Sequence, residues 1–147
     1  MATPQPVIER IFRKLGGHQS LGTDVHSEAD LARVVRRGMK PSVLAHVRRA
    51  GFSQREIEQY IIPSRTLRHR RARRKPLSTE ESDRVVRMTR IQALAEDVFG
   101  ETENASRWLR DPLGILDGHS PLEVAATEAG ARLIEELLAK IDWGAAA

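Results

Sequence analysis

The sequence predicts an all-α fold from three observations. Hydrophobic residues make up 40% of the 147 residues but aromatic residues only 4%, so the core must consist mainly of Leu, Ile, Val and Ala, which suits helices packed on helices. Three capping boxes, each a Ser followed three residues later by Glu, predict helix starts at Ser53, Ser78 and Ser120. No stretch alternates polar and apolar residues for long enough to predict a strand.

Four helices are expected in the N-terminal part of the chain. Apolar residues at helical spacing, bounded by Gly, Pro or Ser, predict them over residues 7–15, 28–37, 41–50 and 54–60. Gly16-Gly17 would end the first helix and Gly38 the second, while Pro41 would stand at the first position of the third.

The densest charge lies in Pro63–Lys75, which holds seven Arg or Lys residues and no acidic one. Such a block repels itself, so we expect it to face a polyanion, of which nucleic acid is the commonest. A helix ending near Tyr60 precedes it across a short break, and Ser64 is expected to cap the basic helix that follows. Helix, short turn and basic helix together predict a helix-turn-helix.

In a helix-turn-helix, the leading end of the second helix reaches base edges and its flanks bind phosphates. The residues expected at the leading end are Ser64, Arg65, Thr66, Arg68 and His69. Those expected at phosphates are Arg70, Arg71, Arg73, Arg74 and Lys75. The alternative is a solvated basic surface or a patch that binds RNA without sequence choice. Ile61 stands where the turn usually carries Gly, so the turn is expected to be wider or shifted by one residue.

The C-terminal half predicts a long helix followed by shorter ones. The helices are expected over 79–99, from a cap at Thr102 to the Asp111-Pro112 pair, from Pro121, and over 128–141 with Gly144 as the stop. The last helix has an apolar face and a mostly acidic one. Trp143, just past its expected end, is either a lid on its own core, which the usual burial of aromatic residues favours, or an anchor for another protein.

Charge and composition exclude several classes of function. Residues 1–100 carry 20 basic and 11 acidic side chains, whereas residues 101–147 carry 4 and 9, so two different partners are expected. The absence of Cys excludes disulfides, thiol nucleophiles and Cys-ligated zinc, and fits the cytoplasm. No membrane span or signal-peptide core is visible. The His residues show no metal-site spacing and no catalytic set surrounds any Ser, so we expect no enzyme activity, metal or cofactor.

An ordered set of short motifs runs through the rest of the chain: Arg65-Thr66-Leu67, Leu77-Ser78-Thr79-Glu80-Glu81-Ser82-Asp83-Arg84, Ala95-Glu96-Asp97-Val98-Phe99-Gly100, Ala105-Ser106-Arg107-Trp108-Leu109, Leu116-Asp117-Gly118, Ser120-Pro121-Leu122-Glu123, Thr127-Glu128-Ala129-Gly130-Ala131-Arg132 and Ile141-Asp142-Trp143-Gly144. In these motifs the sequence from Gly38 onward resembles the Xre/MbcA/ParS-type antitoxins that accompany RES-domain toxins. No one of these motifs is decisive, but the ordered set is specific. Trp143 and Ala145 stand where the family more often has Tyr and Val.

The resemblance implies a DNA-binding helix-turn-helix region over residues 1–77 and a small helical toxin-binding and self-association domain over residues 78–147, joined through the long helix. It implies that the chain represses its own operon by binding operator double-stranded DNA, and that it forms a homodimer. RES toxins consume NAD, and antitoxins of this family place their C-terminal end at the toxin's NAD cleft. The residues implied at the toxin are Thr127, Glu128, Arg132, Glu136, Asp142, Trp143 and Gly144.

Two other functions stay open. A stand-alone repressor would use its C-terminal domain only to dimerise, and would keep every function without residues 142–147. An RNA-binding or nucleoid-type protein would bind random and operator DNA equally, with a steep dependence on salt.

Overall fold

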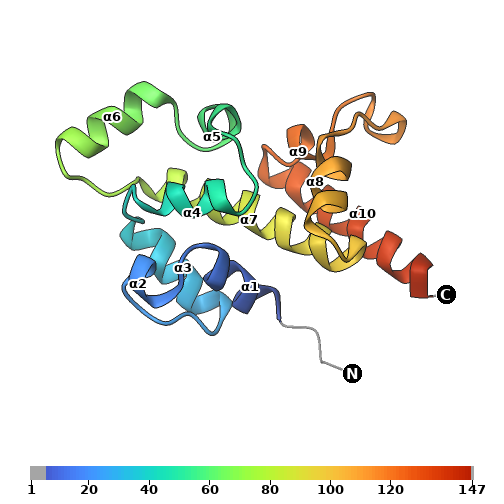
Figure 1. The fold of residues 1–147 in the computed structure, drawn as a ribbon, viewed down its shortest axis with the longest axis horizontal. Coiled ribbons are helices and arrows are strands. Elements are labelled where there is room, and N and C mark those ends of the chain that lie inside the picture. Colours follow the sequence, from blue (N-terminus) through green and yellow to red (C-terminus); the bar gives the residue numbers. More distant parts are fainter. Residues whose placement is uncertain (1–5, 147) are drawn as a thin grey trace. The chain divides into compact units, whose positions relative to one another are not determined.

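The computed structural model describes residues 6–146, and over these residues the chain forms helices and no strand. The all-α prediction is therefore confirmed (Figure 1). The chain divides into two compact units, one up to Thr89 and one from Arg90. The predicted division into DNA-binding and toxin-binding regions at residues 77 and 78 concerns function and stays a prediction.

From residue 6 onward, the N-terminal unit contains six helices and the first half of a seventh. They are α1 (Val7–Lys14), α2 (Gly17–Leu21), α3 (Glu28–Arg37), α4 (Val43–Arg49), α5 (Gln54–Tyr60), α6 (Ser64–Ala72) and α7 (Thr79–Phe99), the last of which continues into the second unit. α1 packs against α2 and α4. The core is aliphatic, as the composition predicts, and its fully buried side chains include Ile11, Leu15, Val43, Val47, Ile57, Ile62 and Leu77.

The C-terminal unit contains the rest of α7 and four further elements. They are α8 (Thr102–Arg110), the short 3-10 helix η1 (Gly114–Leu116), α9 (Pro121–Val124) and α10 (Glu128–Ala146). α9 packs against both α8 and α10. Phe99 and Trp108 place their rings 5.4 Å apart at a tilt of 41°. Leu109, Leu122, Ile134 and Leu138 are buried.

The predicted capping boxes form at the starts of α5 and α7. At Ser78, the hydroxyl accepts from the Glu81 N–H at 3.1 Å, and Glu81 accepts from the Ser78 N–H at 2.7 Å. The same pair of bonds joins Ser53 and Glu56. Ser120 accepts from the Glu123 N–H at 3.2 Å and so caps α9. Because these signals are local, the helix starts that they predict are confirmed.

Other predicted helix ends are wrong. Helix α2 was not expected, because Gly17–Leu21 is too short to show apolar periodicity. The third predicted helix begins at Val43, since Pro41 lies in the turn before it. Helix α8 takes Glu101 as its N-cap rather than Thr102. The last helix does not stop before Gly144 but continues to Ala146, because three consecutive Ala residues favour helix after a solvent-exposed Gly.

No helix within residues 6–146 combines the length and the apolar character that crossing a membrane requires.

Candidate functional site

The turn between α5 and α6 consists of three residues, 61–63. Ile61 has φ −118° and ψ −63°; because its φ is negative, this position of the turn does not need Gly. The Ile62 N–H donates to the Ile57 carbonyl at 2.9 Å, and the Leu67 N–H donates to the Pro63 carbonyl at 3.0 Å. Ile61 and Ile62 are both buried and anchor the turn in the core of the N-terminal unit.

Helix α6 presents to solvent three of the five side chains predicted at its leading end. Leu67 is its buried residue, and at about 100° per residue Arg65 and His69 lie on the opposite side of the helix. Arg68 lies beside them, and all three are exposed. The structure therefore brings Arg65, Arg68 and His69 together on one outward face.

The predicted cap of α6 is wrong. Pro63 is the N-cap residue and Ser64 is the first residue of the helix. The Ser64 hydroxyl donates to the carboxylate of Glu58 on α5. Hydrogen bonds from Ser64 and then Gln54 lower the pKa of Glu58. Ser64 and Thr66 are half-buried on the flanks of the helix.

Arg70 differs from the other residues expected at phosphates, because it forms an ion pair within the protein. Its Nε and Nη2 atoms donate to the Glu81 carboxylate at 3.1 and 3.3 Å. The two side chains are 31% and 7% exposed. Burial raises the pKa of Glu81, but hydrogen bonds from Ser78 and Arg70 and the charge of Arg70 outweigh it, so the pKa is lowered.

The end of α6 closes with a Schellman motif. The Lys75 N–H donates to the Arg70 carbonyl at 2.9 Å, and the Arg74 N–H donates to the Arg71 carbonyl at 3.2 Å. Arg74 takes the left-handed position, with φ +52°, where Gly is usual. Arg71, Arg73, Arg74 and Lys75 are all exposed.

The first turns of α7 hold the helix-turn-helix in place. Arg84 Nε donates to the carbonyl of Ile61, in the turn before α6, at 2.8 Å. Ser82 is buried and accepts from the Met39 N–H at 2.9 Å. Sequence reasoning missed Glu81 and Arg84 as positioning residues. The capping box indicated Glu81, but no local pattern indicates a partner eleven residues away.

Four of the residues implied at the toxin lie along one stripe of α10. Glu128, Arg132, Glu136 and Trp143 fall within about 80° around the helix axis at 100° per residue, and all are exposed. Asp142 and Gly144, also exposed, lie on either side of this stripe, while the Thr127 hydroxyl accepts from the Gly130 N–H at 3.0 Å before the first turn. Arg132 and Glu128 form an exposed ion pair at 2.9 Å.

Trp143 is 79% exposed, so its interpretation as a lid on its own core is wrong. The usual burial of aromatic residues does not hold here, because Trp143 lies beyond Leu138, the last buried side chain of α10 among the described residues. Leu133 is the other large hydrophobic side chain of α10 that is exposed among the described residues.

Gly130 is a structural requirement of the C-terminal unit that sequence reasoning did not single out. A Cβ atom at this position would lie 1.7 Å from the carbonyl oxygen of Val124. Helix α9 therefore ends against the first turn of α10 at a distance that only Gly permits.

The described residues contain no group of three or more His, Asp or Glu side chains that could hold a metal ion.

Comparisons with known proteins match both halves of the chain. Residues 30–90 match the family model of the Antitoxin Xre-like helix-turn-helix domain. Residues 94–144 match that of the Antitoxin Xre/MbcA/ParS C-terminal toxin-binding domain.

Three relatives have similar sequences. Antitoxin Xre of Pseudomonas putida is 44% identical over 84 residues, 57% of this chain and about half, 53%, of that protein. Prs ADP-ribosylating antitoxin of Sphingobium sp. is 30% identical over 130 residues, 81% of this chain and 82% of that protein. Antitoxin Xre of Yersinia enterocolitica is 29% identical over 145 residues, 97% of this chain and 94% of that protein. With both family models matched in chain order, this chain belongs to the Xre/MbcA/ParS family of antitoxins.

Proposed function

We propose that this chain neutralises a RES-domain, NAD-consuming toxin by covering the toxin's active site with the end of α10. The exposure of Trp143 carries the proposal. A Trp outside its own core exposes apolar surface to water, which is unfavourable unless a partner buries it. Trp is also strongly enriched among the residues that anchor protein interfaces.

The charge of α10 supports the same partner. Glu136, Asp142 and the paired Glu128 make its outward side mostly acidic. A cleft that binds the phosphates of NAD is expected to be basic, so an acidic helix end complements it. Such complementarity would speed the encounter and orient Trp143 toward the cleft.

We propose further that the chain represses its own operon through α6. Arg65, Arg68 and His69 would face base edges, and Arg71, Arg73, Arg74 and Lys75 would bind phosphates. Arg70 would act as a positioning residue, because its guanidinium group is held by Glu81. On this proposal the protein acts in the cytoplasm and binds the operator as a homodimer.

The test is co-expression with the product of the adjacent gene, scored by growth and cellular NAD. A chain ending at Ile141 lacks Asp142 and Trp143, and a chain ending at Gly144 is the matched control. We expect the full-length chain and the control to rescue growth and the shorter chain to fail. Rescue by all three would place neutralisation elsewhere on the C-terminal unit. A neighbour that is harmless alone would favour a stand-alone repressor.

A further inference from the structure

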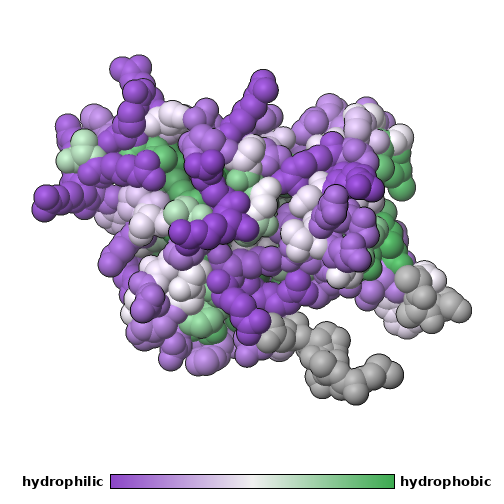
Figure 2. Space-filling view, viewed as in Figure 1, coloured by the Kyte–Doolittle hydropathy of each residue, from purple (hydrophilic) through white to green (hydrophobic). Residues whose placement is uncertain are grey.

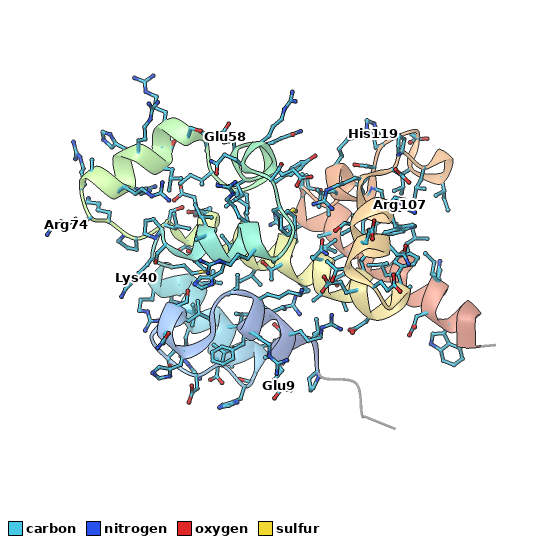
Figure 3. All side chains as sticks on the ribbon, in the orientation of Figure 1. Glu9, Lys40, Glu58, Arg74, Arg107 and His119 are labelled. Atoms are coloured by element: carbon cyan, nitrogen blue, oxygen red, sulfur yellow. The ribbon has the colours of Figure 1, made fainter. Side chains whose placement is uncertain are left out.

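The N-terminal unit contains a cavity of about 830 Å³ beside the end of α6. Its walls come from the end of α2, from the segment between α3 and α4, and from the segment after α6. Lys40 belongs to the segment between α3 and α4, and Arg74 belongs to the segment after α6; both are labelled in Figure 3. Small-molecule sites typically measure about 300–1,000 Å³, so this volume suits a ligand much larger than a single ion.

The charge of the lining is entirely positive. None of the described residues that line the cavity is Asp or Glu, and six are cationic: Arg37, Lys40, Arg70, Arg71, Arg74 and Lys75. Arg70 is paired with Glu81, and Arg37 donates to the Leu21 carbonyl at 2.6 Å. The other four have no carboxylate partner among residues 6–146, so the cavity attracts an anion with several charges.

Part of the lining is apolar. Pro41 is half-buried and Pro76 is exposed, whereas Leu21, Val34 and Met39 are buried and offer a ligand almost no surface. Figure 2 shows hydrophobic surface among the hydrophilic side chains in the region of α6. An inorganic anion would leave the two prolines uncovered, whereas a ligand with a flat ring would cover them.

We propose that this cavity binds a nucleoside phosphate. The phosphates would lie at Lys40, Arg71, Arg74 and Lys75, and the base would cover Pro41 and Pro76.

Binding there has a consequence for DNA, which rests on the function proposed above. Arg71, Arg74 and Lys75 are also expected at DNA phosphates, so a bound nucleotide would neutralise part of the DNA-binding surface. Nucleotide and operator would then compete for this chain.

The test is calorimetric titration of the full chain with ADP, and separately with adenosine and with inorganic phosphate. We expect ADP to bind at least about tenfold more tightly than either, because each alone satisfies only part of the lining. Lys40→Glu should weaken ADP binding by about tenfold or more through charge. Ser42→Trp should weaken it by filling space while keeping every cation, because Ser42 is exposed and lines the cavity.

Arg13→Glu is the matched control, because Arg13 is an exposed cation of α1 outside the cavity. Equal weakening by Arg13→Glu and Lys40→Glu would overturn the proposal, as would ADP binding no tighter than phosphate. If ADP does not bind and Lys40→Glu weakens operator binding, the cavity belongs to the DNA interface and the proposal is wrong. If the chain binds no operator, the proposed function fails, and the ADP titration still decides the cavity.

Discussion

Glu81 binds Arg70 and the start of α7 with the same carboxylate. Its Oε1 atom accepts from the Ser78 N–H at 2.7 Å and from Arg70 Nε at 3.1 Å. One side chain therefore caps α7 and fixes the last turns of α6. The orientation of the basic helix depends on this carboxylate and on Arg84, which holds the turn at the other end of α6.

Glu81→Ala should destabilise the N-terminal unit by about 2 kcal/mol, because it removes half of a capping box and leaves Arg70 without its partner. Urea unfolding followed by circular dichroism measures this loss. Both Trp residues lie in the C-terminal unit, so their fluorescence reports on that unit alone. A shift in the unfolding curve seen by circular dichroism but not by Trp fluorescence would place the loss of stability in the N-terminal unit. Glu80→Ala, at an exposed neighbour, is the control and should change stability by less than about 0.5 kcal/mol.

The pH dependence of stability should also reflect the interactions of Glu81. The pKa of Glu81 in the folded protein lies below its ordinary value of 4.5, so its charge stabilises the fold above that value. This contribution is lost as the pH falls through the folded-state pKa. Glu81→Gln should therefore lose less stability than the wild type between neutral pH and pH about 3. Equal loss in both proteins would show that Glu81 does not contribute.

Arg65→Ala and Arg68→Ala should each weaken operator binding by about 1–3 kcal/mol and relax the choice of base, if the side chain reads a base edge. Gel shifts with operator and random DNA measure both effects. Arg73→Ala should weaken the two DNAs equally, as a phosphate contact does. Unchanged operator affinity in both the Arg65 and Arg68 variants would exclude α6 as the reading helix.

Arg74→Gly should raise the unfolding free energy by about 1 kcal/mol, because Arg74 has a left-handed backbone that favours Gly. Arg74→Ala removes the same charge without relieving the backbone, so it isolates the effect of conformation. Thermal unfolding of the two variants measures the difference. Equal stabilities would mean that the charge rather than the backbone decides.

Trp143→Ala should weaken toxin binding by about 2–4 kcal/mol and leave the stability of the chain unchanged, because the side chain is exposed. Trp108→Ala is the contrasting variant. It removes the ring that contacts Phe99 and should lower the melting temperature of the C-terminal unit. Unfolding of the Trp143 variant would show that this residue belongs to the core after all.

Gly130→Ala should destabilise the C-terminal unit by about 3 kcal/mol, because the added Cβ meets the Val124 carbonyl. Gly144→Ala is its matched control. It lies in the same helix, with open space around it, and should be neutral or slightly stabilising. Fluorescence-detected urea unfolding compares the two. Similar midpoints would contradict the close approach of α9 to α10.

Local signals explain which parts of the fold the sequence predicts well. A capping box needs only four consecutive residues, and those at Ser53 and Ser78 form as predicted. Helix α2 has no such signal, and Gly144 indicates a stop that three following Ala residues override. Composition predicts an aliphatic core but not which helices share it.

The candidate sites likewise have features that the local sequence predicts and features that depend on packing. The basic face of α6 can be predicted from the sequence because Arg65, Arg68 and His69 are close together in the chain. The ion pair of Arg70 depends on how α6 packs against α7, so the sequence does not distinguish Arg70 from its basic neighbours. Exposure of Trp143 likewise depends on where α10 ends, and the cavity beside α6 is lined by residues from 20 to 76.

Helix α7 sets how the chain can be divided for experiments. A fragment ending at residue 77 would lack Glu81, Ser82 and Arg84, and with them the partners of Arg70, Met39 and Ile61. A DNA-binding fragment designed from this structure should extend to Thr89, where the first compact unit ends. A shorter fragment that failed to bind operator would report a loosened helix pair rather than the absence of DNA-binding residues.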